Sequence, residues 1–262
     1  EVSSIGKKHH VPLIMDNTAA PYISKPIQHG ANVIVYSTTK YIGGHGISIG
    51  GLLIDGGNFD WEAAGDRFKM LNSPDPSYHG AVWTQAAKPL GPIAYILRAR
   101  VILLRDLGAA MSPFNAFMFI QGLETLPLRM QRHCQNAEKV ANFLENHSKV
   151  EKVIYPSLMN DQYLERAKKY LNEGFGALLG FELKDGVEAG KNFINNLKLF
   201  YHVANIGDAR SLAIHPSSTT HSQLSEKEQL SSGVTPGYVR LSIGIEHIDD
   251  ILEDLEQALS SS

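Results

Sequence analysis

The stretch that most constrains the fold of this chain runs from residue 11 to residue 51. It holds two short apolar runs, 11–15 and 33–36, which are partly β-branched and bounded by turn-forming residues. Runs of this kind are typical of strands buried in an α/β sheet. Each run is followed directly by polar residues, Asp16-Asn17-Thr18 and Ser37-Thr38-Thr39-Lys40. Ligands of open α/β sheets bind outside the carboxyl ends of strands, which makes Asp16 and Lys40 candidates to face one crevice.

An acid and a lysine at neighbouring strand ends fit more than one kind of site. A metal site is weakly supported, because Asp16 is a single carboxylate with no cluster of His or Asp nearby. A nucleotide-binding P-loop places its glycines before the lysine, whereas here Gly43, Gly44 and Gly46 follow Lys40. A Schiff-base lysine fits better, because a glycine-rich loop lets backbone and ligand approach a desolvated amine closely. A salt-bridged Asp–Lys pair at the rim of the sheet explains the same spacing about equally well.

The hydroxyls of Ser37 and Thr39 stand two positions apart in the run before the lysine. They can donate to a phosphate while Lys40 reaches a cofactor ring, and an acid across the crevice can keep a pyridine nitrogen protonated. Together with the run 43–46, Gly-Gly-His-Gly, these residues resemble the pyridoxal phosphate (PLP) signature of the Cys/Met-metabolism family. That family includes cystathionine γ-synthase, cystathionine γ-lyase, methionine γ-lyase and the O-acetylhomoserine sulfhydrylases.

The resemblance implies a role for each of these residues. Lys40 is then the catalytic lysine that forms the Schiff base with PLP, and Asp16 is the partner of the pyridinium nitrogen. Ser37 and Thr39 bind the cofactor phosphate, and Thr18 lines the ring.

The resemblance also implies a fold, the α/β fold of type I PLP-dependent transferases, which is like that of aspartate aminotransferase. Residues 1–133 then form the C-terminal portion of an incomplete PLP-binding large domain, and residues 134–262 form the smaller C-terminal α/β domain. Family members carry a long preceding segment with the phosphate-cradling loop, a stacking aromatic and residues lent across a dimer interface. We therefore expect this chain to be the C-terminal part of a homo-oligomeric enzyme, a homotetramer built as a dimer of dimers.

Composition narrows the class of protein further. The 262 residues carry a formal net charge of −3 and a single cysteine, Cys134, which excludes a disulfide framework and a thiolate metal cluster. No apolar run reaches the roughly 18 residues of a membrane-spanning helix, and nothing suggests a nucleic-acid or membrane partner. We expect small-molecule substrates and a cytoplasmic location.

A segment rich in turn formers, residues 55–85, separates the first strands from the next helices. Long irregular segments in compact domains are usually functional or interfacial, although a surface segment pinned by Trp61, Phe68 and Trp83 fits equally well. The runs 58–61 and 74–80 resemble the insertion of O-acetylhomoserine sulfhydrylases. The γ-lyases and γ-synthases have a shorter connection there.

Periodic apolar residues predict the remaining elements. Helical spacing begins at Ile93, a second helix is expected to start at Ser112-Pro113, and Pro127 is expected to disturb it. A further helix follows, and Cys134 is expected to pack in it rather than react. The C-terminal half then alternates, with strands over 176–183 and 238–243 and helices over 186–197 and from Ile248 onward.

Arg240 is a second candidate functional residue, far along the chain from Asp16 and Lys40. Val239, Leu241 and Ile243 share one face of its predicted strand, so Arg240 points to the other. A guanidinium can hold a substrate carboxylate through two parallel hydrogen bonds, although an ordinary surface arginine fits the pattern too.

The family resemblance extends to this strand. Residues 239–246 look like the family's carboxylate-binding strand. The run 204–208, with 211–212 and 215–221, matches the loop that completes the α-carboxylate site. Asn205 stands in that loop where many relatives carry serine, and it is a substrate-binding candidate through its backbone or its side chain. His215 and His221 are expected to stabilise turns rather than bind metal.

The implied reaction is a γ-replacement on O-acetyl-L-homoserine with sulfide or a related thiol, giving L-homocysteine and acetate in methionine biosynthesis. Cystathionine γ-synthase, cystathionine γ-lyase and methionine γ-lyase share every catalytic residue named. A non-catalytic fragment without the cofactor cradle is the remaining alternative.

Overall fold

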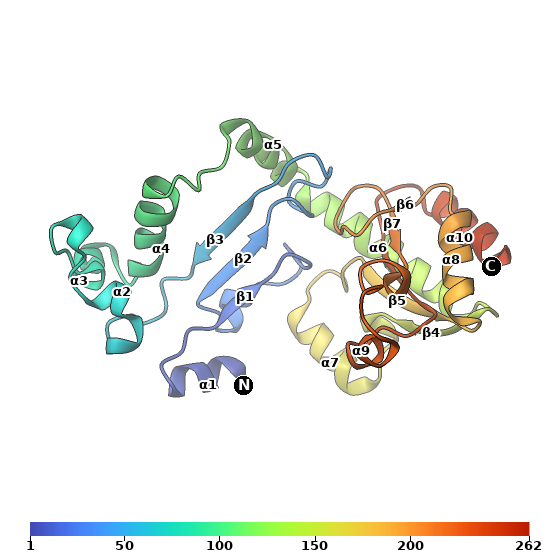
Figure 1. Ribbon diagram of the computed structural model, residues 1–262, viewed down its shortest axis with the longest axis horizontal. Coiled ribbons are helices and arrows are strands. Elements are labelled where there is room, and N and C mark those ends of the chain that lie inside the picture. The colour runs from blue at the N-terminus through green and yellow to red at the C-terminus, as the bar shows by residue number, and fades with distance from the viewer. Residues whose placement is uncertain (262) are drawn as a thin grey trace. The chain divides into compact units, whose positions relative to one another are not determined.

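The computed structural model describes residues 1–261, which form two compact units (Figure 1). Unit 1 contains residues 1–18, 25–38 and 49–117, and unit 2 contains residues 19–24, 39–48 and everything from Met118 onward. Within the described residues no helix has the length and apolar character needed to span a bilayer.

Unit 1 is built on a three-stranded sheet in the order β1-β2-β3. Helix α1 (Val2–Lys8) precedes β1 (Ile14–Asp16), which pairs in parallel with β2 (Val33–Ser37) after a 3-10 turn, η1 (Pro26–His29). Strand β3 (Gly51–Asp55) returns antiparallel to β2, and the three strands lie side by side in Figure 1.

The prediction of two buried strands is confirmed for one of them. Val33 is fully buried in β2, whereas Ile14 and Met15 of β1 are 50% and 41% exposed. The first strand is also shorter than expected, because pairing starts only at Ile14. Strand β1 is at an edge of the sheet, where one row of its backbone N–H and C=O groups has no neighbouring strand among the described residues.

The segment predicted to be irregular, residues 55–85, consists of loops that join short helical turns. The turns are η2 (Gly65–Phe68), α2 (Lys69–Asn72), η3 (Pro76–Tyr78) and the start of α3 (Trp83–Ala87). Each of these turns is too short to show a helical period in the sequence. The segment that follows holds η4 (Lys88–Leu90), α4 (Ala94–Arg98) and the π-helix η5 (Ala99–Asp106), and it confirms the helical spacing predicted from Ile93.

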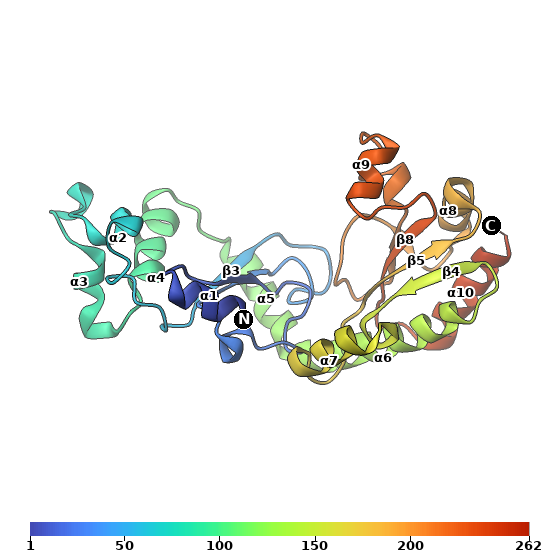
Figure 2. The same ribbon diagram turned by 90° about the horizontal axis from the view of Figure 1, so that it is seen from below.

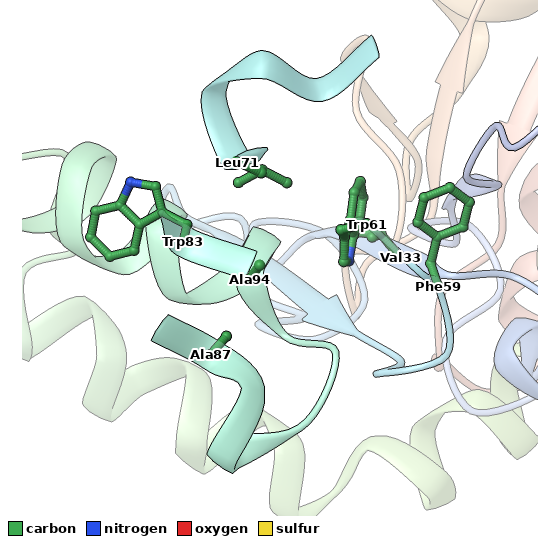
Figure 3. Packing of buried hydrophobic residues seen from close by; sticks show 7 residues of the cluster. All are labelled: Val33, Phe59, Trp61, Leu71, Trp83, Ala87 and Ala94. Carbon is green, nitrogen blue, oxygen red and sulfur yellow. The ribbon is translucent and has the colours of Figure 1, made fainter. Parts of the chain in front are cut away.

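An aromatic core holds these turns together (Figure 3). Trp61 and Trp83 are buried, as the alternative of a pinned segment predicts, and Phe59, Leu71, Ala87 and Ala94 pack with them and with Val33 of β2. The Trp61 ring stacks on Tyr95 with centroids 5.2 Å apart. Large aromatic rings supply enough buried area to order a segment that lacks long helices.

Two helices lead into unit 2. Helix α5 (Pro113–Glu124) ends just before α6 (Leu126–Glu145), and Pro127 lies in the first turn of α6. Proline is tolerated there because the first N–H groups of a helix have no partner within it, so the predicted break at Pro127 is confirmed. The predicted domain boundary after residue 133 falls within α6 and stays a prediction.

Unit 2 has a five-stranded sheet in the order β4-β5-β8-β7-β6. Its strands are β4 (Val150–Ile154), β5 (Leu178–Leu183), β6 (Tyr201–His202), β7 (Leu212–Ile214) and β8 (Tyr238–Ser242). All neighbours pair antiparallel except β6 and β7. The connecting helices are η6 (Pro156–Leu158), α7 (Asp161–Tyr170), α8 (Gly186–Asn196), η7 (Pro216–Ser218), α9 (Glu226–Ser231) and α10 (Ile248–Ser260).

The core of unit 2 confirms the predicted apolar faces. Val239, Leu241 and Ile243 are completely buried, as are Val140 and Leu144 on α6. Helix α10 packs against both α6 and α8, and these two helices contact β5 (Figure 2). Each fully buried branched side chain contributes about 1.5–3 kcal/mol, so β8 is held firmly at the centre of this sheet.

Candidate active site

One group of candidate residues belongs to unit 1 and lies at the carboxyl ends of β1 and β2. Asp16 is the last residue of β1, and its carboxylate accepts the Thr18 N–H at 2.9 Å. The Thr18 hydroxyl oxygen accepts the Ser37 N–H at 2.8 Å, which ties the two strand ends together. The structure therefore brings Asp16, Thr18 and Ser37 together, as the strand-end argument predicts.

The electrostatics at this strand end favour a charged Asp16. The Thr18 hydroxyl, and after it the Thr18 N–H, lower the pKa of the Asp16 carboxyl below its ordinary value. The next residue, Asn17, is buried, and its side-chain amide donates to the Tyr36 hydroxyl at 2.9 Å. This bond ties the end of β1 to β2. An exposed, ionised carboxylate is the partner that a protonated ring nitrogen requires.

A second group of candidate residues belongs to unit 2, where three predicted residues form one chain of contacts. The Lys40 Nζ donates to the Asn205 side-chain oxygen, and the Asn205 backbone oxygen accepts from Arg240 Nη2 at 3.3 Å. All three side chains are half-buried. Asn205 thus contacts Lys40 through its side chain and Arg240 through its backbone. The sequence left open whether the backbone or the side chain of Asn205 makes contacts, and both do.

Arg240 has the orientation expected from strand alternation. It lies in β8 between the buried residues Val239 and Leu241, and pairs with Gly180 of β5 and Ile214 of β7. Its guanidinium remains half-buried on the other face of the sheet. Thr39, the second predicted phosphate ligand, is half-buried directly before Lys40.

Sequence inspection missed the residues that support this group. Tyr41, next to Lys40, is completely buried and its ring meets that of His133 edge-on, with centroids 5.3 Å apart. Burial raises the pKa of the Tyr41 phenol and lowers the pKa of His133 to about 4. Ser242 of β8 accepts the Gly207 N–H at 3.0 Å, close to the Asn205 loop.

Arg129 is the other residue that sequence inspection missed. It is buried on α6, and its spacing from Leu126 and His133 places it on the buried face of that helix. An arginine on an apolar helical face is the signal that could have marked it.

His215 is one of the two histidines that are expected to stabilise turns. His215 lies in a turn, where its Nδ1 contacts the Ser218 hydroxyl and its Nε2 contacts the Pro236 carbonyl oxygen, each at 2.8 Å. These contacts confirm a turn-stabilising role for His215. Among residues 1–261 no group of three potential His, Cys, Asp or Glu ligands gathers around a common point.

Known proteins match the chain along almost its whole length. A family model described as Cys/Met metabolism PLP-dependent enzyme matches residues 1–260. The chain belongs to this family. The α/β fold with mixed sheets and covering helices agrees with the fold that the resemblance implied.

Curated relatives within this family carry names that are more specific than the family description. The O-acetyl-L-homoserine sulfhydrylase of Leptospira meyeri is 57% identical over 99% of this chain and 60% of its own length. The homocysteine synthase of Schizosaccharomyces pombe is 46% identical over 98% of this chain and 60% of its own. This chain therefore spans about 60% of the length of the curated relatives it matches.

A solved structure agrees with these matches. A Campylobacter jejuni protein given the provisional name O-acetylhomoserine (thiol)-lyase superposes with a TM-score of 0.90 at 44% identity. The match covers 99% of this chain and 61% of that protein, which carries N'-pyridoxyl-lysine-5'-monophosphate.

The donor groups present in this chain fit PLP, the cofactor of the family. Lys40 supplies a primary amine held by an amide oxygen, and Asp16 supplies an ionised carboxylate at a strand end. Hydroxyls at Thr18, Ser37 and Thr39 supply uncharged donors of the kind that bind a phosphate or line a ring.

Proposed function

We propose that this chain carries the catalytic lysine and the carboxylate-binding arginine of a PLP-dependent enzyme that makes L-homocysteine. Sulfide, or a related thiol, replaces the acetoxy group at Cγ of O-acetyl-L-homoserine and acetate leaves, a reaction of methionine biosynthesis. The names of the relatives support this assignment. The observation that carries it is the continuous contact from the Lys40 amine through Asn205 to the Arg240 guanidinium.

Arg240 binds the α-carboxylate of the substrate in this proposal. Its bond to the Asn205 backbone oxygen uses one of five guanidinium N–H groups, and a two-point grip on a carboxylate needs two others. The bond to Asn205 also orients the plane of the guanidinium, so that the amino acid binds in one orientation.

Lys40 moves protons in this proposal. Its amine would take the proton from Cα and pass it to the cofactor carbon, and only then take a proton from Cβ, which allows the γ-substituent to leave. It would return protons by the reverse route after sulfur has added at Cγ. Asn205 accepts a hydrogen bond from Lys40 Nζ and so limits the positions that the amine can take.

Asp16, Thr18, Ser37 and Thr39 hold the cofactor in this proposal. PLP, when bound, supplies an electron sink for the electrons left by Cα deprotonation. Asp16 keeps a proton on the ring nitrogen, and its lowered pKa keeps the carboxylate charged at neutral pH. Ser37 and Thr39 bind the phosphate, and Thr18 lines the ring.

We also propose that the protein acts in the cytoplasm as a homo-oligomer, a dimer of dimers. Exposed apolar side chains on β1 and β3, among them Ile14, Met15 and Leu52, support further protein contacts. Light scattering after size-exclusion chromatography measures the oligomer, and a monomer at micromolar concentration would contradict this part.

The first experiment is an absorbance spectrum of the purified protein with added PLP, before and after borohydride. We expect a visible band and, after reduction, a stable adduct that peptide mass spectrometry locates on Lys40. Lys40→Arg, which keeps the charge, serves as the control and forms no adduct. Free cofactor that washes away from the unchanged protein would contradict the proposal.

A product assay tests the substrate. O-acetyl-L-homoserine with sulfide is expected to give homocysteine faster than cystathionine or methionine gives a ketoacid. The reverse order would favour a γ-lyase. Efficient use of cysteine in place of sulfide would favour a cystathionine γ-synthase.

A further inference from the structure

We propose that Arg129 is a positioning residue that fixes the backbone directly after Lys40, and with it the amine of Lys40 relative to Asn205 and Arg240. The inference rests on the proposed role of Lys40. It assigns a function to a buried cation on α6 that touches none of the candidate site residues itself.

The contacts of Arg129 converge on the segment that follows the lysine. Its Nη1 donates to the Tyr41 carbonyl at 2.7 Å, and its Nη2 donates to the Ile42 carbonyl at 3.2 Å. The Nη2 also donates to the Gly122 carbonyl near the end of α5 at 2.7 Å, and the Nε donates to the Thr125 hydroxyl at 3.1 Å. One guanidinium thus joins the Lys40 segment to the α5–α6 junction.

The electrostatic setting of Arg129 is unusual. The residue is 7% exposed, and within residues 1–261 no carboxylate forms an ion pair with it. A buried charge is costly unless hydrogen bonds compensate for lost water, so carbonyl and hydroxyl oxygens take the role of a counterion. Burial lowers the pKa of Arg129, although a guanidinium stays protonated at neutral pH. Keeping the Arg129 charge buried costs free energy, which indicates that this residue has a role other than solubility.

Two glycines make room for this arrangement. A Cβ on Gly44, whose φ is +74°, would lie 2.6 Å from Arg129 Nη1. A Cβ on Gly122 would collide with the carbonyl oxygen of Ile42. The loop after Lys40 and helix α5 therefore approach each other more closely than residues with side chains allow.

The loop after Lys40 is also bound by the loop that carries Asn205. The Gly44 carbonyl accepts the Ala209 N–H at 2.8 Å, and the Gly44 N–H donates to the Lys40 carbonyl at 2.8 Å. The turn that begins at Lys40 is thus closed on itself and bound to the segment that carries Asn205. Arg129 binds the turn to α6, so its loss would leave the turn attached through the Asn205 loop and free to shift against α6.

A small shift of this turn is enough to matter for catalysis. A displacement of about 1 Å at a reacting group costs roughly 100-fold in rate, because proton transfer needs the donor and acceptor in line. Substrate affinity depends mainly on Arg240, which Arg129 does not contact. Removing the Arg129 contacts should therefore lower kcat while leaving KM nearly unchanged.

The test compares Arg129→Lys with Arg132→Lys in the PLP-loaded protein. Lysine keeps the charge but cannot reach four acceptors at once, and Arg132 is an exposed arginine three residues along the same helix. We expect kcat to fall about 100-fold in Arg129→Lys, with KM for O-acetyl-L-homoserine within about threefold, and no change in Arg132→Lys. Equal kcat values in the two variants would overturn the proposal, as would a parallel loss in kcat and rise in KM.

A second readout does not depend on cofactor or turnover. Hydrogen exchange in the cofactor-free protein should accelerate in peptides covering residues 41–46 and 205–211 of Arg129→Lys, and remain unchanged in β4 and β5. Faster exchange throughout unit 2 would indicate a general structural role and overturn the proposal. This readout also separates the two proposals, because a protein that forms no adduct on Lys40 can still show whether Arg129 holds the loop.

Chemical rescue sharpens the assignment. Millimolar guanidinium should restore part of the lost kcat of Arg129→Ala, whereas urea, which has a similar shape and no charge, should not. If Arg129→Ala does not fold, Thr125→Val removes the acceptor of Arg129 Nε together with the hydroxyl's bond to the Gly122 carbonyl, and Thr125→Ser, which keeps the hydroxyl, is its control. A Thr125→Val protein with unchanged kcat and unchanged exchange at 41–46 would overturn the proposal.

Discussion

The Asp16 group in unit 1 and the Lys40 group in unit 2 are held by contacts of different range. Thr18 bonds to Asp16 two positions away and to Ser37 nineteen positions away, across one pair of parallel strands. Lys40 bonds to Asn205 across 165 positions, and Asn205 bonds to Arg240 across 35. The first group needs only that β1 and β2 pair, whereas the second needs most of unit 2 to fold.

The strands that carry the two groups also differ in burial. Strand β1 is an exposed edge strand, while β8 carries Val239 and Leu241 in the completely buried centre of a five-stranded sheet. Residues on exposed strand ends tolerate changes nearby, because few other groups depend on them. Residues placed by a packed core respond to changes far from the chemistry, because interiors transmit displacement. Mutations in the two groups should therefore differ in kind.

The largest effect is expected for Lys40→Ala. Loss of the amine removes the group that bonds the cofactor and moves protons, so turnover should fall by at least about 1,000-fold. Borohydride should no longer produce an adduct on this segment. Normal turnover in Lys40→Ala would contradict the assignment of the catalytic lysine.

Asp16→Asn tests the group in unit 1. The amide can still accept the Thr18 N–H, so the strand end should stay intact and some cofactor should remain bound. A neutral amide does not stabilise a protonated ring nitrogen, so kcat should fall several hundred-fold, or roughly 3–4 kcal/mol in barrier height. Steady-state kinetics and cofactor content measure the two effects. Full activity would exclude Asp16 as the partner of the ring nitrogen.

Arg240→Ala tests the group in unit 2 through substrate binding. Two charge-assisted hydrogen bonds are lost, so KM for the amino acid should rise about 100-fold while PLP binding changes little. Arg240→Lys, which keeps the charge without the planar fork, should fall in between. An unchanged KM would show that another group binds the carboxylate.

The smallest effect concerns the stability of unit 2 rather than its chemistry. Burial lowers the pKa of His133 to about 4 from the ordinary 6.5, so between these values the unfolded chain binds a proton that the folded chain does not. Stability conferred by neutral His133 is complete above pH 6.5 and is lost as the pH falls toward 4. From pH 7 to pH 5 the free energy of unfolding should drop by about 2 kcal/mol through this group.

Denaturant titrations at the two pH values measure this drop. His133→Gln does not titrate, so its stability should depend less on pH, while the exposed control His9→Gln should behave like the unchanged protein. Identical pH dependence in all three proteins would show that the pKa of His133 does not differ between the folded and unfolded states, and would contradict the prediction.

Local patterns were enough to predict several features. Alternation along 238–243 predicted that Arg240 would leave the core while its neighbours entered it, and they are completely buried. The proline at 127 predicted the break between α5 and α6. The helical turns between residues 65 and 87 escaped prediction, because each is too short to show a helical period.

The sequence by itself determined the strand ends, the chemical types placed there and the family, because these depend on short-range periodicity and on motifs of adjacent residues. Only the tertiary structure decided that Asn205 meets Lys40, that β1 is exposed, and that Arg129 grips the backbone after the lysine. Contacts between distant residues have no local signature. They arise from the packing of whole helices and strands, and packing is a property of the folded chain.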